Sequence, residues 1–167
     1  MITKPILEYR TEQPYAAVPL QAPIPFGKYL APAWEAARLW LERQGVAPRG
    51  APFIRYLTTD MSTKLDLEVG FPVDQLLPGD DHISTGILPA GKYATLVYTG
   101  SVRGKGLVKA TITLLDWANA NAIRWDTSPA GKTERWNGRL EWYLTDPQAE
   151  PDPQKWQTEL AFLVAEP

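Results

Sequence analysis

Apolar and polar residues alternate along several short stretches of the chain, a pattern typical of β-strands with one buried face. Residues 65–73 show it most clearly, because every second residue there is apolar: Leu65, Leu67, Val69, Phe71 and Val73. Shorter runs of the same kind predict further strands in residues 6–20, 53–59, 93–98, 139–145 and 156–164. Pro14 lacks a backbone N–H group, so it restricts the first of these runs to an edge strand or a bulge.

Two other stretches carry apolar residues at helical spacing. The first begins after Pro32, places Trp34, Ala37 and Leu41 on one face, and ends before Gly45. The second covers residues 107–121, and its predicted inner face contains Leu107, Ala110, Leu114, Trp117 and Ala118. The sequence therefore predicts two amphipathic helices among the strands.

The predicted elements occur twice in the same order: strand, helix, strand, strand. Four pairs of short segments match: PYAAV with KYATL, EAARLWL with ITLLDWA, FIRYLTTD with RLEWYLTD, and LEVGFPV with TELAFLV. We predict a single domain over residues 1–167, with repeat one in about 1–75 and repeat two in about 86–167. Residues 74–85 and the long segment after the second helix are predicted to be loops.

This order of elements predicts an α+β fold made of duplicated βαββ units with pseudo-twofold symmetry. The sheet is expected to be curved and mostly antiparallel, with both helices on the face that carries Leu65, Leu67 and the other apolar strand positions. The opposite face, which is expected to carry Glu141 and Tyr143, would then form a concave ligand cleft between the repeats.

The composition of the chain argues against several classes of partner and functional site. The 167 residues carry 19 acidic and 17 basic side chains, a net charge of −2, so neither nucleic acid nor an anionic membrane is an expected partner. The sequence contains no Cys, which excludes disulfides, thiolate metal ligands and a Cys nucleophile. No stretch has the pattern of a signal peptide or a membrane span, so we expect a cytoplasmic protein.

Two motifs could in principle bind a phosphate or a metal ion, but ordinary structural roles are the better interpretation of both. The loop GSVRGKG, residues 100–106, has the wrong glycine spacing for a phosphate-binding loop, and a tight turn into the helix is the better interpretation. His82 is the only histidine and follows Asp80 and Asp81, but consecutive residues do not easily converge on one ion. We therefore predict neither a metal site nor a cofactor, and no serine triad.

Glu141 is the main candidate for a functional residue. On its predicted strand it shares a face with Arg139 and Tyr143, and the matching strand of the first repeat offers Tyr56. In solvent, Glu141 would simply pair with Arg139. In an aromatic cleft, desolvation would raise its pKa; ionised, it would attract an organic cation, and protonated, it would act as a general acid.

Seven Trp are many for a chain of this length. Trp34 and Trp117 lie on the predicted helices, where core packing is the better interpretation. Trp125 and Trp136 lie in the long loop, where they either line a pocket or anchor the loop. The full set of predicted ligand-binding residues is Glu141, Tyr143, Tyr56, Trp125, Trp136, Phe26 and Tyr29.

The segments LPAGKYATLVYTG and RLEWYLTDP, with the Glu141-x-Tyr143 pair, resemble the GyrI-like small-molecule-binding family, also called the AraC-type effector-binding domain. The resemblance covers nearly the whole chain and implies a duplicated βαββ fold. It also implies that Glu141 is the acidic residue at the pocket floor, with Tyr143 and Tyr56 in the lining. The chain begins at the first strand, so we expect no helix-turn-helix and no direct contact with DNA.

Three hypotheses follow from the residues and the resemblance. The leading one is a domain that binds hydrophobic, aromatic and often cationic small molecules for sensing, sequestration or resistance. The second is a hydrolase of cyclopropane-containing aromatic compounds, with Glu141 and Tyr143 as catalytic residues. The third is an inhibitor that binds a larger enzyme such as DNA gyrase. Whether the protein is an enzyme is left open at this point.

Overall fold

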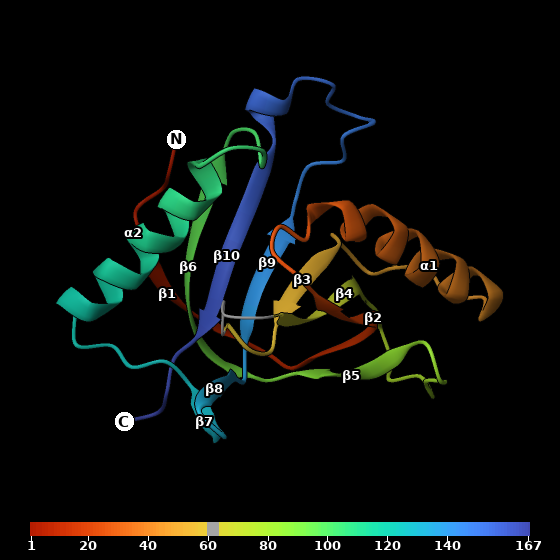
Figure 1. Cartoon of the computed structure of the whole chain (residues 1–167), viewed down its shortest axis with the longest axis horizontal. Helices are drawn as coiled ribbons and strands as arrows, with labels where there is room; N and C mark the ends of the chain where they lie inside the picture. The colour runs from red at the N-terminus through yellow and green to blue at the C-terminus, as the bar shows by residue number, and fades with distance from the viewer. Residues whose placement is uncertain (60–63) are drawn as a thin grey trace.

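The computed structural model describes residues 1–59 and 64–167, so the last residue of the matched segment FIRYLTTD lies outside the described residues. Among the described residues, two strands precede the first α-helix, four lie between the two α-helices and four follow the second (Figure 1). The first half contains β1 (Ile6–Arg10), β2 (Gln13–Ala22), α1 (Leu30–Arg43), β3 (Phe53–Tyr56) and β4 (Leu65–Pro72). The second half contains β5 (Ser84–Leu88), β6 (Gly91–Thr99), α2 (Gly106–Ala120), β7 (Thr127–Ala130), β8 (Thr133–Trp136), β9 (Arg139–Tyr143) and β10 (Gln157–Leu163).

Eight of these strands form one curled sheet, in the order β1-β6-β10-β9-β3-β4-β2-β5. Every neighbouring pair is antiparallel. Exchanging β1, β2, β3 and β4 with β5, β6, β9 and β10, respectively, reverses this order. The arrangement is therefore the same from either edge of the sheet, and the β9–β3 pair lies at its centre. The α+β class and the curved antiparallel sheet are confirmed, and among the described residues each half contributes one α-helix and four strands to this symmetric arrangement, one strand more than the predicted βαββ unit. The duplication within the sequence stays a prediction.

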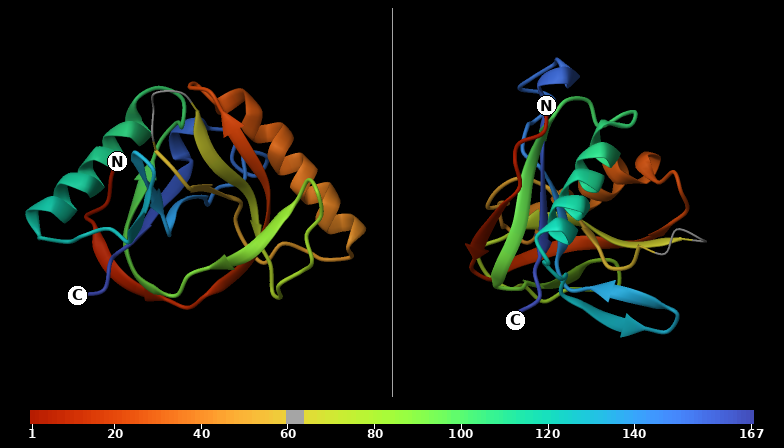
Figure 2. Two further views of the ribbon diagram at one scale, coloured as in Figure 1. Left: turned by 60° about the horizontal axis from the view of Figure 1, so that its bottom comes forward. Right: turned by 90° about the vertical axis from the view of Figure 1, so that its left-hand side faces the viewer.

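Both helices lie on one side of the sheet (Figure 2). On α1, Ala33 packs against a cluster that includes Ile54, Leu67 and Val69 from β3 and β4. On α2, Ala110 and Leu114 pack against a cluster from β6 and β10. The helical spacing read from the sequence therefore predicted the buried faces of both helices. Neither helix is long and apolar enough to cross a membrane, among the residues that the structure describes.

A second core fills the inside of the curl, on the side of the sheet away from the helices. It contains the residues Tyr15, Ala17, Phe53, Leu88, Tyr93, Leu140, Ala161 and Leu163, with Trp142 packed against it. Burial of the strands on both faces explains why short runs such as β9 are apolar on one face and still carry aromatic residues on the other. The predicted ligand cleft on this side is therefore occupied by packed side chains.

The face assignment of Glu141 and Tyr143 was wrong. Tyr143 packs against Trp34 of α1, with ring centroids 5.0 Å apart. Glu141 lies between Ile54 of β3 and Leu160 of β10, which both belong to the helix-side clusters. Alternation along β9 separated its two faces correctly, but both faces are buried, so the pattern alone could not show which one the helices cover.

Strands also form in two segments where none was predicted, and the first of them begins at the end of the predicted loop 74–85. Ser84–Leu88 forms β5 and pairs with β2, and Thr127–Ala130 and Thr133–Trp136 form the hairpin of β7 and β8. The hairpin turns at Gly131, whose positive φ of 65° favours glycine. Its strands are short and polar and include Pro129, so they lack the alternation that predicts strands.

Candidate functional site

Glu141 is buried in the middle of the sheet, with 7% of its surface exposed. Its position on β9 places it at the central seam, where β9 pairs with β3 of the first half. The cross-strand neighbours Ile54 and Leu160 are both fully buried and apolar. The solvent-exposed alternative considered from the sequence is therefore excluded.

Two tyrosine hydroxyls hold the carboxylate. Tyr143 Oη donates to Glu141 Oε1 at 2.8 Å, and Tyr56 Oη donates to the same oxygen at 3.0 Å. Tyr143 lies two residues along the same strand, whereas Tyr56 comes from β3. Among the described residues none donates to the second oxygen, Oε2. The Glu-x-Tyr pair and the matching Tyr56 therefore come together as one hydrogen-bonded group.

Burial controls the protonation of this group. Desolvation raises the pKa of Glu141 above its ordinary value of 4.5, while the hydrogen bonds from Tyr143 and Tyr56 and the positive charge of Arg139 lower it. Burial also raises the pKa of both tyrosines, and the charge of Glu141 raises it further. The two hydroxyls therefore remain protonated donors, and Glu141 is an acid whose charged form is weakly stabilised.

Aromatic rings surround the hydrogen-bonded group on the helix side. Trp34 contacts Tyr143 edge to face, and Phe26, from the segment before α1, contacts Tyr56 with ring centroids 6.2 Å apart. The sequence selected Phe26 for this place but assigned Trp34 to the core. Trp34 donates its indole N–H to the carbonyl oxygen of Phe53 at 3.2 Å, so one end of the ring is anchored and the other faces Tyr143.

Arg139 completes the group in a way that the sequence did not indicate. Its guanidinium carbon lies 4.6 Å from the ring centroids of Trp136 and Phe162, and 5.7 Å from that of Tyr56. The structure shows no ion pair between Arg139 and Glu141 within its described residues. The position of Arg139 on the same strand face as Glu141 was the available signal.

Trp125 and Trp136 pack together in the cluster under α2, and Trp136 also contacts Arg139. Their ring centroids are 5.9 Å apart, and both contact Phe162. Trp136 is nearly buried and reaches Arg139 directly, whereas Trp125 reaches it only through its neighbours. They pack as a cluster, and a role for either in lining a ligand site stays a prediction.

Tyr29 lies apart from the group. It is 36% exposed, and the ammonium of Lys28 lies 5.2 Å from its ring centroid. With Pro23, Ile24 and Pro25 it lines an open hollow of about 390 Å³ in the loop before α1. Phe26, in the same loop, is the residue that reaches Tyr56. The lining of this hollow therefore includes neither Glu141 nor its two tyrosine partners.

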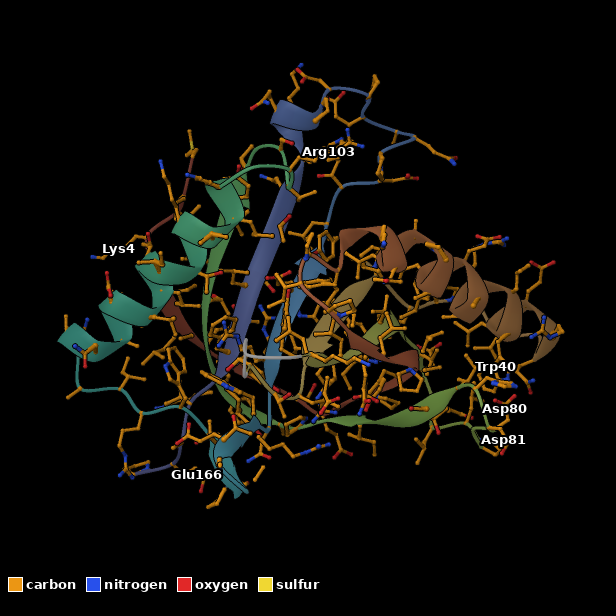
Figure 3. The ribbon with its side chains drawn as sticks, in the orientation of Figure 1. Lys4, Trp40, Asp80, Asp81, Arg103 and Glu166 are labelled. Atoms are coloured by element: carbon orange, nitrogen blue, oxygen red, sulfur yellow. The ribbon has the colours of Figure 1, made fainter. Side chains whose placement is uncertain are left out.

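Asp80 organises the turn that contains His82. Its carboxylate accepts hydrogen bonds from the backbone N–H groups of His82 and Ile83 and from the indole of Trp40. Figure 3 shows Trp40, Asp80 and Asp81 together near the end of α1. The backbone hydrogen bond from His82 is the main cause of a lowered pKa of Asp80. The described residues contain no cluster of three or more potential metal ligands.

The model of the GyrI-like small molecule binding domain matches residues 3–165. The chain belongs to the GyrI-like family. As a member of this family, the domain binds small molecules. No curated protein sequence matches the chain.

Solved structures share the fold of this GyrI-like domain. The C-terminal domain of EcmrR has a TM-score of 0.81 at 19% identity, with 98% of both chains covered. The chain spans 58% of EcmrR as solved in its complex with DNA. SAV2435 bound to tetraphenylphosphonium has a TM-score of 0.60 at 12% identity, with 98% of this chain and 94% of that one covered. A hydrolase from Listeria innocua has a TM-score of 0.61 at 13% identity, covering 97% and 92%. At these identities the likeness shows the fold alone.

Proposed function

We propose that this domain binds hydrophobic aromatic small molecules, many of them cationic, against Glu141 between the two helices. The observation that carries the proposal is a buried carboxylate held by two neutral hydroxyl donors, with no ion pair from the described residues. Removing a carboxylate from water is unfavourable unless its charge is compensated. A ligand cation would supply that compensation, so sensing, sequestration or resistance are fitting roles.

The surroundings of Glu141 suit the rest of such a ligand. Tyr56, Tyr143, Trp34 and Phe26 present aromatic rings around the carboxylate. Each contact between a cation and one of these rings would add roughly 0.5–2 kcal/mol. The rings now pack on one another, so a ligand would take the place of some of these contacts.

Tetraphenylphosphonium is the natural first probe, because it is an aromatic lipophilic cation and SAV2435 has the same fold. Titration into the wild-type protein should quench Trp fluorescence with micromolar affinity. Glu141→Gln should bind about tenfold more weakly, since it keeps the shape of the side chain and removes its charge. Glu8→Gln, which changes an exposed strand carboxylate, is the matched control and should bind like wild type.

Equal affinity of wild type and Glu141→Gln would contradict the proposal, provided that both proteins unfold cooperatively. Isothermal titration calorimetry would check that the fluorescence change reports stoichiometric binding. A second buried carboxylate, Glu68, has its own arginine partner and should not contribute.

The two alternatives stay predictions. Glu141 with a raised pKa, held at 2.8 Å by Tyr143, has the geometry of a general acid, which favours the hydrolase hypothesis over the inhibitor hypothesis. Incubation with a cyclopropane-containing aromatic alkylator, followed by mass spectrometry, would detect a hydrolysed product. Turnover that survives Glu141→Gln would exclude this residue as the acid.

A further inference from the structure

Arg139 is a second charged group on the strand face that carries Glu141. It lies two residues before Glu141 on β9 and directly across from Phe162 on β10. Its guanidinium is enclosed by the rings of Trp136, Phe162 and Tyr56. Tyr56 joins the two charges, because its hydroxyl donates to Glu141 while its ring faces Arg139.

The bonding of Arg139 is unlike that of the other partly buried arginines. Arg10 pairs with Glu159 at 2.8 Å, and Arg55 pairs with Glu68 at 3.3 Å. In the part of the chain that the structure describes, Arg139 forms no ion pair, and this sets it apart, because the buried Nε atoms of both Arg139 and Arg55 lack a hydrogen-bond partner. Aromatic faces stabilise its charge in place of an ion pair. Burial lowers the pKa of Arg139, while the charge of Glu141 acts in the opposite direction.

We propose that Arg139 determines which ligand charge the site accepts. Arg139 forms no ion pair with Glu141 among the described residues, so its guanidinium offsets only part of the negative charge of the carboxylate, and the site prefers lipophilic cations while still accepting zwitterionic aromatic molecules. This inference rests on the proposed function, because it requires that aromatic ligands bind beside Glu141. Without Arg139 the site would become strongly selective for cations.

The effect is electrostatic and therefore separable from packing. A ligand charge placed among these rings feels both Arg139 and Glu141 within a poorly solvated region, where charges interact more strongly than in water. Loss of the arginine charge should strengthen cation binding and weaken anion binding. A merely structural role of Arg139 would change both affinities in the same direction.

Tetraphenylphosphonium and tetraphenylborate form the decisive pair of probes, since they have nearly the same size and shape and opposite charge. In wild type the phosphonium should bind more tightly than the borate, because the charge of Glu141 is only partly offset by Arg139. Arg139→Gln should bind the phosphonium about tenfold more tightly and the borate about tenfold more weakly, each tenfold change being about 1.4 kcal/mol. Arg139→Lys keeps the positive charge and should restore most of the wild-type ratio.

Glu141→Gln gives a second test with Arg139 in place. The unbalanced guanidinium should then favour the borate by about tenfold, which keeps the inference testable if Arg139→Gln does not fold. An Arg139→Gln ratio within threefold of wild type, or equal changes for both probes, would overturn the role of Arg139 alone. Failure of every folded variant to bind either probe would overturn the proposed function, and this inference with it.

Discussion

Two glutamates are buried in the same sheet, on opposite faces, and their partners differ. Glu68 on β4 is 6% exposed and Glu141 on β9 is 7% exposed. Glu68 accepts a hydrogen bond from Tyr15 at 2.8 Å and forms an ion pair with Arg55 at 3.3 Å. Glu141 accepts only from tyrosine hydroxyls among the described residues. The two carboxylates are thus equally buried, but only that of Glu68 has an ion-pair partner among the described residues.

The difference separates a structural carboxylate from a candidate functional one. Arg55 also donates to Tyr15 and to the carbonyl oxygen of Asn137, so the Glu68 group ties β2, β3 and β4 to the segment before β9. Its charges are matched within the protein, and no ligand is needed. Glu141 has no such ion-pair partner among the described residues. The positive group of a cationic or zwitterionic ligand could compensate the charge of this buried carboxylate.

The largest expected effect is on stability and concerns the compensated pair. Arg55→Met leaves the Glu68 carboxylate buried without its cation, so the free energy of unfolding should fall by about 3–5 kcal/mol. Urea unfolding followed by Trp fluorescence measures it. The double variant Arg55→Met/Glu68→Gln should recover much of the loss, because the two residues are coupled. A loss below about 1 kcal/mol would show that the pair is not the structural element described above.

Removal of one tyrosine hydroxyl from Glu141 should have a smaller effect. Tyr143→Phe deletes the 2.8 Å hydrogen bond to Oε1 and should lower the free energy of unfolding by about 1.5 kcal/mol near neutral pH. It should also weaken tetraphenylphosphonium binding, since an edge of the site changes. Tyr9→Phe removes the hydroxyl of an exposed strand tyrosine and should leave both quantities unchanged. Full retention of stability in Tyr143→Phe would indicate that Glu141 does not depend on this donor.

Neutralisation of Glu141 should have the opposite sign from the loss of Arg55. Glu141→Gln removes a buried charge and keeps an oxygen that accepts from Tyr56 and Tyr143, so the unfolding free energy at pH ~8 should rise by about 1 kcal/mol. Chemical denaturation at that pH tests it. A marked loss of stability would mean that the carboxylate of Glu141 is compensated in the free protein, as that of Glu68 is.

The smallest expected effect is a pH dependence specific to Glu141. Because its folded-state pKa is raised above the ordinary value of 4.5, the folded protein holds this proton more tightly than the unfolded chain. The stability of wild type relative to Glu141→Gln should therefore be greatest below pH 4.5, fall as pH rises through the folded-state pKa, and then level off. Unfolding free energies of both proteins across this range give the difference. A difference that grows with pH would contradict the burial of an uncompensated acid.

The local pattern of apolar and polar residues predicted most strands and the buried faces of both helices. Period-two alternation identified the strand face shared by Arg139, Glu141 and Tyr143, and helical spacing identified the buried faces of α1 and α2. It could not identify the β7–β8 hairpin, whose short strands lack regular alternation and bury one large apolar side chain, Trp136, at the end of β8. It also could not assign Trp34 to the site, because a tryptophan on an inner helix face has the same sequence pattern in a core and beside a ligand.

The sequence by itself determined both helices, most strands of the large sheet, the family resemblance and the placement of Glu141 and Tyr143 on one strand face, because these depend on residues close together in the chain. Only the tertiary structure decided which face the helices cover and which partner each buried carboxylate receives. Tyr56 reaches Glu141 across 85 residues, and Arg55 reaches Glu68 through the pairing of β3 with β4. Both faces of the central strands are buried, so strand pairing and the curl of the sheet, rather than residue pattern, set these contacts.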